Sequence, residues 1–136
     1  MQIRPYQDSD RQAVIALWRR VFPDAPAHND PATDIDRKLA VQSELFFVAL
    51  SGESLIGTAM AGFDGHRGWV YYVAVSPEYR RRGVGTALMR RVEEALAARE
   101  CGKLNLQIRA SNEPVVAFYR ALGYAIEDRI SMGKHL

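Results

Sequence analysis

The segment of this sequence best suited to bind a ligand is residues 76–86, SPEYRRRGVGT, where three arginines precede two glycines. A predicted strand ends just before the segment, and a predicted helix starts near Gly83. Backbone N–H groups at a helix N-terminus lack partners within the helix and together carry about half a positive charge. Glycines at 83 and 85 would let a pyrophosphate approach those groups closely. The pattern therefore predicts a phosphate-binding loop.

Other phosphate motifs fit this loop poorly. The sequence contains no Gly-Lys-Ser/Thr for a P-loop, and Leu88 stands where a dinucleotide-binding loop needs its third small residue. From the residues alone, two other interpretations stay open: a helix start with solvated charges, and nucleic-acid recognition by the arginines. The arginine run has no interleaved aromatic residues, which disfavours the second interpretation.

A second group of residues that could do chemistry lies in residues 112–124, NEPVVAFYRALGY. Asn112 follows a predicted strand, and Tyr119 lies on the short helix that comes next. Phe118 and Leu122 share one face of this helix and are expected in the core. Tyr119 is turned about 100° from Phe118, so we expect a half-buried ring with a solvated hydroxyl.

The patterning of apolar residues predicts the elements that position these two groups. Strands are expected at residues 3–6, 45–50, 55–63, 69–75, 104–108 and 124–132, and helices at 14–21, 29–42, 83–100 and 114–121. The resulting order, β-α-α-β-β-β-α-β-α-β, predicts an α/β fold of the α+β kind, with a mixed sheet and helices on its faces. A chain of 136 residues is expected to form a single domain, 1–136.

Composition narrows the classes of function. The formal net charge is +2, but residues 1–64 hold nine acidic against six basic residues, whereas residues 65–112 hold nine basic against four acidic. This basic excess suits one small polyanion and is too small for strong nucleic-acid binding, while the acidic half favours a cationic second ligand. A lone cysteine, Cys101, and the lack of a long apolar run predict a cytoplasmic protein with no disulfide and no membrane partner. No metal is expected.

Together, the two groups resemble the motifs of the GNAT family of acetyl-CoA-dependent N-acetyltransferases. The family pattern Arg/Gln-x-x-Gly-x-Gly/Ala is matched by Arg80, Gly83 and Gly85. Its second motif, an Asn followed seven residues on by a Tyr and then by Gly-aromatic, is matched by Asn112 and Tyr119 with Gly-Tyr at 123–124. The element order also matches over almost the whole chain. Residues 29–31, 62–68 and 71–72 are similar to the small YpeA-like bacterial acetyltransferases.

The resemblance implies the GNAT acyl-CoA N-acyltransferase fold, acetyl-CoA as cosubstrate, and roles for particular residues. Two strands would splay apart at a bulge, and the pantetheine arm would bond to the backbone of Val73 and Val75. Tyr119 would protonate the leaving thiolate as general acid, and the Val75 amide would stabilise the oxyanion. The positions implied for binding acetyl-CoA are Val73, Val75, Arg80, Arg81, Arg82, Gly83, Val84, Gly85, Thr86, Asn112 and Tyr119.

The general base is where this sequence departs from the family. Many members carry a Glu at the position of Tyr71, and residues 69–75 contain no carboxylate. Asp64 or His66 could accept a proton through water, and Tyr72 could orient the acceptor, although an acceptor amine of lowered pKa would need no strong base.

The expected function is therefore direct transfer of an acetyl group from acetyl-CoA to a primary amine of an unidentified small-molecule or peptide acceptor. One alternative is a catalytically inactive acyl-CoA sensor, supported by the missing Glu. Another is a module that binds a polyanion or a protein partner through the arginines. The sequence leaves a homodimer open.

Overall fold

The computed structural model describes residues 1–26 and 30–136. The expected helix start at Asn29 lies outside the described residues. The chain divides into two compact units, Met1–Leu106 and Gln107–Leu136. Whether 1–136 acts as one domain stays a prediction.

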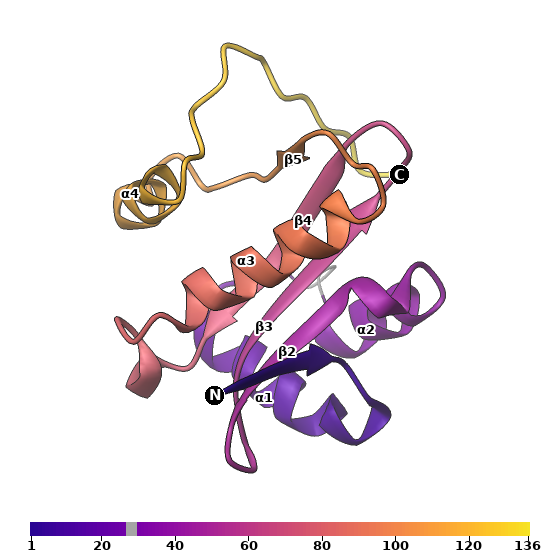
Figure 1. Cartoon of the computed structure of the whole chain (residues 1–136), viewed down its shortest axis with the longest axis vertical. Coiled ribbons are helices and arrows are strands. Elements are labelled where there is room, and N and C mark those ends of the chain that lie inside the picture. The colour runs from indigo at the N-terminus through magenta and orange to yellow at the C-terminus, as the bar shows by residue number, and fades with distance from the viewer. Residues whose placement is uncertain (27–29) are drawn as a thin grey trace. The chain divides into compact units, whose positions relative to one another are not determined.

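The first unit is built on a five-stranded mixed sheet (Figure 1). The strands are β1 (Gln2–Pro5), β2 (Phe46–Ser51), β3 (Ser54–Phe63), β4 (Gly68–Val75) and β5 (Leu104–Asn105). They lie side by side in chain order, with antiparallel pairs from β1 to β4 and a parallel pair between β4 and β5. The turn after β2, residues 51–54, is short enough to join antiparallel neighbours directly. The predicted mixed sheet is confirmed.

Helices cover both faces of this sheet. Figure 1 shows α3 (Val84–Ala97) on one face of β3 and β4, with α1 (Arg11–Val21) and α2 (Pro31–Leu39) on the other. The expected inner stripe of α3 is confirmed, since its buried side chains include Val84, Leu88, Val92 and Leu96. On the α1 face the core contains Trp18, Ile35, Phe46 and Val48. Burial of these large apolar side chains is the main stabilising term of the unit.

The second unit contains α4 (Glu113–Ala121), followed by an irregular segment to the C-terminus. The predicted strand at 104–108 is shorter than expected, because only Leu104–Asn105 pairs with β4. The predicted strand at 124–132 is wrong: it pairs with no other strand in the described chain, and Ile126, Ile130 and Met132 are exposed. A strand needs a neighbour for its backbone hydrogen bonds, and three consecutive charged residues at 127–129 break the apolar alternation.

A partly buried ion pair ties β1 to the start of α1. The carboxylate of Asp10 accepts two hydrogen bonds from the Arg4 guanidinium, at 2.7 and 2.9 Å, and one from the Gln7 backbone N–H at 2.8 Å. These bonds, led by the one from Arg4, hold the pKa of Asp10 below its ordinary value. A carboxyl group with a depressed pKa stabilises the fold above its unfolded pKa and loses that contribution in acid.

We therefore expect Asp10→Asn to lower the free energy of unfolding by about 2 kcal/mol at neutral pH. The difference from the unchanged protein should shrink as pH falls below about 4, because the Asp10 carboxyl of the unfolded chain then binds a proton before the folded one, whose pKa is lower, does. Urea unfolding followed by circular dichroism at several pH values measures both effects. The control is Asp36→Asn, because the exposed Arg11–Asp36 pair at 2.9 Å should contribute little. An Asp10→Asn deficit that is the same at pH 3 and pH 7 would contradict this account.

Candidate functional site

A β-bulge interrupts β4 where the resemblance implied one. The β3–β4 register shifts between Thr58 and Met60, so that β4 has one more residue than β3 over this stretch. Tyr72 lies in the inserted stretch with a φ of 52°, in the left-handed region. A bulky side chain in that region is strained unless its surroundings hold it there.

Buried hydrogen bonds hold this bulge in place. The Thr58 hydroxyl donates to the backbone carbonyl of Tyr72 at 2.8 Å and accepts from the Trp18 indole N–H at 2.9 Å. The Trp18 and Tyr72 rings are stacked, with centroids 3.8 Å apart. Thr58 is fully buried, so its hydroxyl gives the bulge carbonyl a partner that water cannot provide. Sequence reasoning missed this role, although a threonine within an apolar strand was the available signal.

Beyond the bulge, backbone groups of β4 point to the side of β5, where the described part of β5 does not pair with them. The Ser76 N–H bonds to the Ile56 carbonyl at 2.8 Å, which makes the preceding Val75–Gly57 pair the non-hydrogen-bonded kind. The Val75 N–H therefore points away from β3. Among the described residues, β5 pairs with β4 only as far as Trp69. Val73 follows the bulge directly, so the strand edge that was expected to receive the pantetheine arm is open.

The loop that leaves β4 is anchored to α1. The Ser76 hydroxyl and the Arg20 guanidinium both donate to the Glu78 carboxylate, at 2.5 and 2.6 Å. These bonds, led by the one from Arg20, lower the pKa of Glu78 to about 2. The contacts fix the short 3-10 turn Pro77–Tyr79 that precedes the arginines.

The start of α3 leaves a set of backbone N–H donors unpartnered within the helix. Gly83 precedes the helix with a φ of 80°, and it has no side chain to cap the first turn. Arg81 is also left-handed, with a φ of 63°. The first-turn donors, which the sequence placed in the phosphate-binding loop, are the N–H groups of Val84, Gly85 and Thr86.

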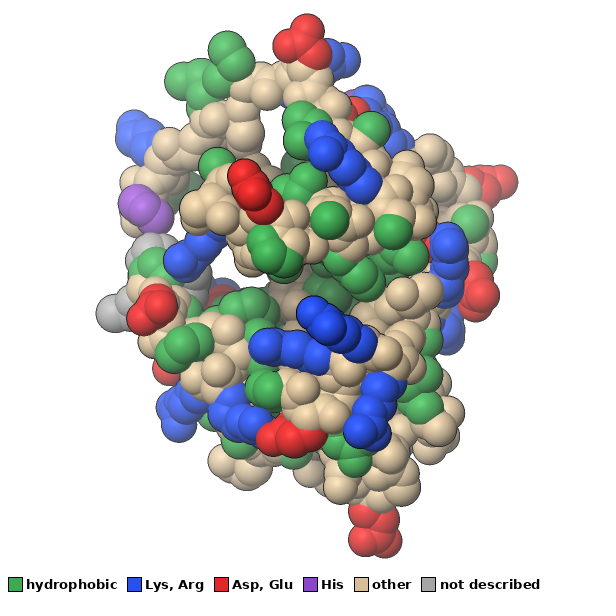
Figure 2. Space-filling view, turned by 90° about the vertical axis from the view of Figure 1, so that its left-hand side faces the viewer, with side chains coloured by type: hydrophobic (Ala, Val, Ile, Leu, Met, Phe, Trp, Pro, Cys, Tyr) green, Lys and Arg blue, Asp and Glu red, His purple; other side chains and the backbone are tan. Residues whose placement is uncertain are grey.

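Basic side chains surround these donors. Arg80, Arg81 and Arg82 are all exposed, and the Arg82 guanidinium lies over the Tyr79 ring, 5.4 Å from its centroid. Figure 2 looks onto the side of the molecule that carries this loop and shows Lys and Arg side chains (blue) gathered in its lower half. Free N–H donors with nearby positive charge fit a pyrophosphate group.

In the second unit, Tyr119 is more buried than its spacing predicted. Its exposure is 7%, whereas Phe118 and Leu122 are half-buried, so the expected assignment of core and boundary positions on α4 is wrong. The Tyr119 ring makes edge contacts with Phe118 and Tyr124, at centroid distances of 4.9 and 5.6 Å. Burial raises the pKa of Tyr119 to about 12. Asn112 immediately precedes α4, its side chain is exposed, and it makes no capping bond.

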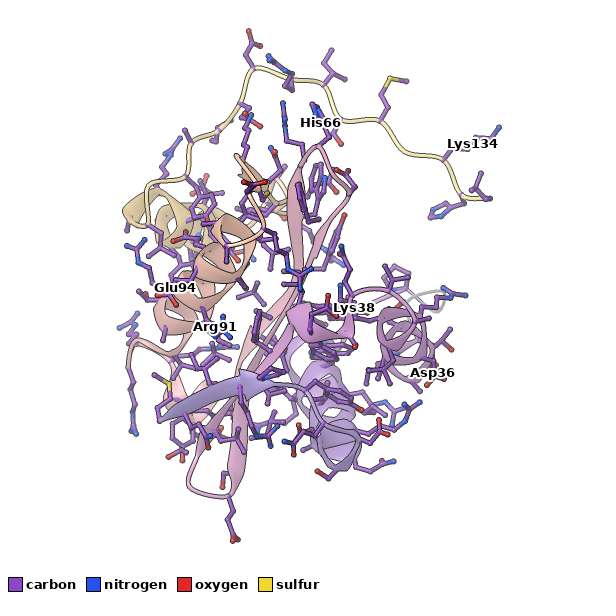
Figure 3. The ribbon with its side chains drawn as sticks, turned by 45° about the vertical axis from the view of Figure 1, so that its right-hand side comes forward. Asp36, Lys38, His66, Arg91, Glu94 and Lys134 are labelled. Carbon is purple, nitrogen blue, oxygen red and sulfur yellow. The ribbon has the colours of Figure 1, made fainter. Side chains whose placement is uncertain are left out.

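Two of the candidate acceptor-side residues form the turn between β3 and β4. The Asp64 carboxylate accepts hydrogen bonds from the backbone N–H groups of His66 and Arg67, both at 2.7 Å. These bonds, the one from Arg67 first, lower the pKa of Asp64. His66 is exposed at the tip of the turn (Figure 3). Both residues stabilise the turn, and a proton-relay role for either stays a prediction.

The other two candidates, Tyr71 and Tyr72, differ in their surroundings. Tyr71 is 51% exposed. The Tyr72 hydroxyl donates to Asp34 Oδ2 on α2 at 2.5 Å, and its role in orienting an acceptor stays a prediction. Burial first and Asp34 second raise the pKa of Tyr72 above its ordinary value. The Asp34 carboxylate therefore lies against β4, a contact between distant residues that no sequence spacing indicated.

A groove of about 510 Å³ runs between α2 and the β3–β4 hairpin. It is lined by Asp34, Arg37, Lys38, Val41, Gln42, Met60, Ala61, Gly62, Phe63, Asp64, Trp69 and Tyr71. Strand β2 pairs with β3 only as far as Met60. Side chains from α2 and from the segment just after it bond to the next part of β3 and fix the wall of the groove. Lys38 donates to the Ala61 carbonyl, and the Gln42 amide exchanges two hydrogen bonds with the Phe63 backbone, at 2.8 and 2.9 Å.

Comparison with known proteins assigns the chain to a family. The model of the Acetyltransferase (GNAT) family matches residues 11–124. The chain belongs to the GNAT acetyltransferase family. The resemblance drawn from the two motifs is thereby confirmed, as is the expected enzyme class.

GNAT relatives from bacteria match the chain along its whole length. "Acetyltransferase YE1169" of Yersinia enterocolitica is 45% identical over 136 residues, which cover 100% of this chain and 96% of that protein. "Acetyltransferase ECA0875" of Pectobacterium atrosepticum is 43% identical over 136 residues, with the same coverage.

Solved structures confirm the GNAT fold. A putative acetyltransferase from Agrobacterium tumefaciens superposes with a TM-score of 0.82 at 19% identity, covering 99% of this chain and 100% of that one. The aminoglycoside N-acetyltransferase AAC(6')-Iy, solved with a bisubstrate analogue, gives 0.83 at 18% identity, covering 99% and 97%. The same enzyme has also been solved in complex with CoA.

Two classes of feature are absent from the described part of the chain. None of its helices is long and apolar enough to cross a membrane. Its His, Cys, Asp and Glu side chains form no group of three or more that could hold a metal ion.

We expect Thr58→Val to destabilise the protein by about 2–3 kcal/mol, because it leaves the Tyr72 carbonyl and the Trp18 N–H unpaired in the core. Thr58→Ser keeps the hydroxyl and removes one methyl group, so it should cost only about 1 kcal/mol. Urea unfolding of the two variants makes the comparison. A valine variant as stable as the serine variant would show that the hydroxyl does not hold the bulge.

Proposed function

We propose that this chain is an N-acetyltransferase that transfers the acetyl group of acetyl-CoA directly to a primary amine, with residues 1–136 acting as one domain. Membership of the GNAT acetyltransferase family supports the transfer, and the start of α3 supports the donor. The observation that carries the donor assignment is the row of N–H groups after Gly83, beside three exposed arginines. A pyrophosphate accepts such donors and carries the complementary charge.

The open edge of β4 supports the catalytic assignment. The Val75 N–H, directed away from β3, would donate to the thioester carbonyl as negative charge develops on it. Asn112, ahead of α4, would bond to the pantetheine arm, as the family motif implies. No covalent enzyme intermediate is needed, since an amine can attack a thioester directly.

Tyr119 is proposed as the general acid that protonates the CoA thiolate. Its pKa of about 12 keeps the hydroxyl protonated throughout the physiological range, which the role requires. The proposal of an amine as acceptor is supported by the family, because GNAT enzymes acetylate amines. The exposed Tyr71, at the position where many family members carry a Glu, is the observation that favours an inactive acyl-CoA sensor instead.

The donor site is tested by thermal denaturation with acetyl-CoA. The melting temperature should rise with millimolar acetyl-CoA, and Gly83→Val should abolish most of that rise, because a β-branched side chain at a φ of 80° distorts the loop. Gly52→Val is a matched control, since Gly52 is also left-handed, at 59°, with open space around it. It should lower the starting melting temperature and keep the shift. A wild-type protein that acetyl-CoA does not stabilise would contradict the proposal, and salt-sensitive binding to any polyanion would favour the polyanion-binding alternative.

The acid role is tested with Tyr119→Phe, using release of the CoA thiol with a panel of primary amines. Turnover should fall by about 100-fold or more while stabilisation by acetyl-CoA persists, because only the transferable proton is lost. The turnover rate of the wild-type enzyme should not fall through deprotonation of Tyr119 at any pH below 10, because burial raises the pKa of this hydroxyl to about 12. Tyr124→Phe, on a ring in edge contact with Tyr119, is the control and should change the rate little. Unchanged turnover in Tyr119→Phe would remove this residue from the mechanism, and no turnover with any amine would favour the sensor.

A further inference from the structure

The groove between α2 and the β3–β4 hairpin combines a carboxylate with an exposed aromatic surface. Asp34 enters it from α2, while Trp69 and Tyr71 come from β4. Tyr71 and Val41 are among the most exposed large apolar side chains of the first unit, at 51% and 61%. Exposed apolar side chains gathered around a hollow are typical of a ligand-binding surface.

One oxygen of Asp34 is fixed and the other is available. The Tyr72 hydroxyl donates to Oδ2 at 2.5 Å, and within the described chain Oδ1 accepts no hydrogen bond. Tyr72 in turn is held by its stacking on Trp18 and by its position in the bulge. The carboxylate is therefore held in a defined orientation in the groove, with one oxygen left to accept a hydrogen bond.

Of the remaining charged groups in the groove, two are hydrogen-bonded to the protein backbone and one, Arg37, is exposed. The Lys38 ammonium is occupied by the Ala61 carbonyl, and burial lowers its pKa. The Asp64 carboxylate is occupied by the backbone of its own turn. Arg37 is exposed and forms no ion pair with Asp34 in the described chain, although it lies three residues further along α2. Residues at this spacing lie on one face of a helix, roughly 5–6 Å apart at Cβ.

We propose that this groove binds the acetyl acceptor, and that the acceptor is a zwitterionic α-amino acid with an apolar or aromatic side chain. Its ammonium group would bind Asp34, its carboxylate would bind Arg37, and its side chain would pack on Trp69 and Tyr71. Opposite charges about one helical turn apart match the two charged ends of an α-amino acid. A polyamine would leave Arg37 facing a like charge. This assignment rests on the proposed N-acetyltransferase function and names its acceptor class.

Asp34 then supplies the carboxylate that residues 69–75 lack. The bound ammonium gives one proton to Asp34, and the freed nitrogen lone pair attacks the acetyl carbonyl carbon. The C–S bond breaks as the C–N bond forms, and the nitrogen loses its second proton. The thiolate takes its proton from Tyr119, and the second proton from nitrogen restores the Tyr119 hydroxyl by way of water. The products are therefore the N-acetyl amino acid, the CoA thiol and one proton released to water from Asp34.

The test compares Asp34→Asn with Asp36→Asn, two substitutions on the same helix. Asp36 lies on the outer side of α2, paired with Arg11, whereas Lys38 points toward the sheet (Figure 3). With phenylalanine as acceptor, Asp34→Asn should lower kcat/KM at pH 7 about 100-fold, and the loss should shrink as pH rises toward the pKa of the ammonium group. Asp36→Asn should stay within twofold of the unchanged enzyme.

The carboxylate end of the acceptor is tested with phenethylamine, which lacks that group. Arg37→Gln should raise KM for phenylalanine about tenfold and leave KM for phenethylamine unchanged. If Asp34→Asn folds poorly, Tyr72→Phe serves instead, because it keeps the ring and releases the carboxylate. It should raise KM for phenylalanine several-fold, with a smaller change in kcat.

The outcomes distinguish a failure of the acceptor assignment from a failure of the proposed N-acetyltransferase function. Stabilisation by acetyl-CoA should be the same in Asp34→Asn and in the unchanged protein. If the unchanged enzyme acetylates spermidine and not phenylalanine, the acceptor class is wrong while the N-acetyltransferase function stands. Equal kcat/KM for Asp34→Asn and Asp36→Asn would overturn the role of Asp34. Absence of any response to acetyl-CoA would instead contradict the proposed function itself.

Discussion

The site depends on one constraint, the need to give a partner to a buried backbone carbonyl at the bulge in β4. An extra residue in a strand breaks the regular ladder, and the Tyr72 carbonyl loses its place in it. Thr58 supplies the missing donor and is itself held by Trp18. Because the bulge is held in this way, the strand after it turns the Val75 amide toward its open side. It also places the Tyr72 ring where its hydroxyl meets α2.

Side chains also replace a missing strand on the other edge of β3. Where β2 no longer pairs with β3, Lys38 and Gln42 bond to the backbone of Ala61 and Phe63. These side-chain hydrogen bonds replace the backbone hydrogen bonds of a neighbouring strand, and they hold α2 against the hairpin. A continuous β2 would have covered this edge, whereas the shortened one leaves room for the groove. The shape of the groove between α2 and the hairpin is therefore set by where strand pairing stops.

Local pattern was sufficient for the helices, for the first four strands and for the start of α3, because these depend on residues close together in the chain. The inner stripe of α3 and its start next to Gly83 follow from spacing alone. The contact of Asp34 with Tyr72 joins residues 38 positions apart, and no local pattern encodes it. The segment 124–132 failed for the opposite reason, since its alternation suggested a strand but pairing requires a neighbour. Tyr119 failed because helical spacing gives a direction and not a degree of burial.

Helix α1 supports both parts of the first unit that a ligand would contact. Trp18 reaches the bulge through Thr58, and Arg20, two residues further on, reaches the loop before α3 through Glu78. A shift or rotation of this one helix would therefore disturb the bulged part of β4 and the loop before α3 together. The two places proposed to hold acetyl-CoA and to polarise its carbonyl are thus coupled mechanically through α1, which contributes no residue to either. Substitutions along α1 should therefore be tolerated only when they keep the helix rigid and in place, even at positions remote from any bound molecule.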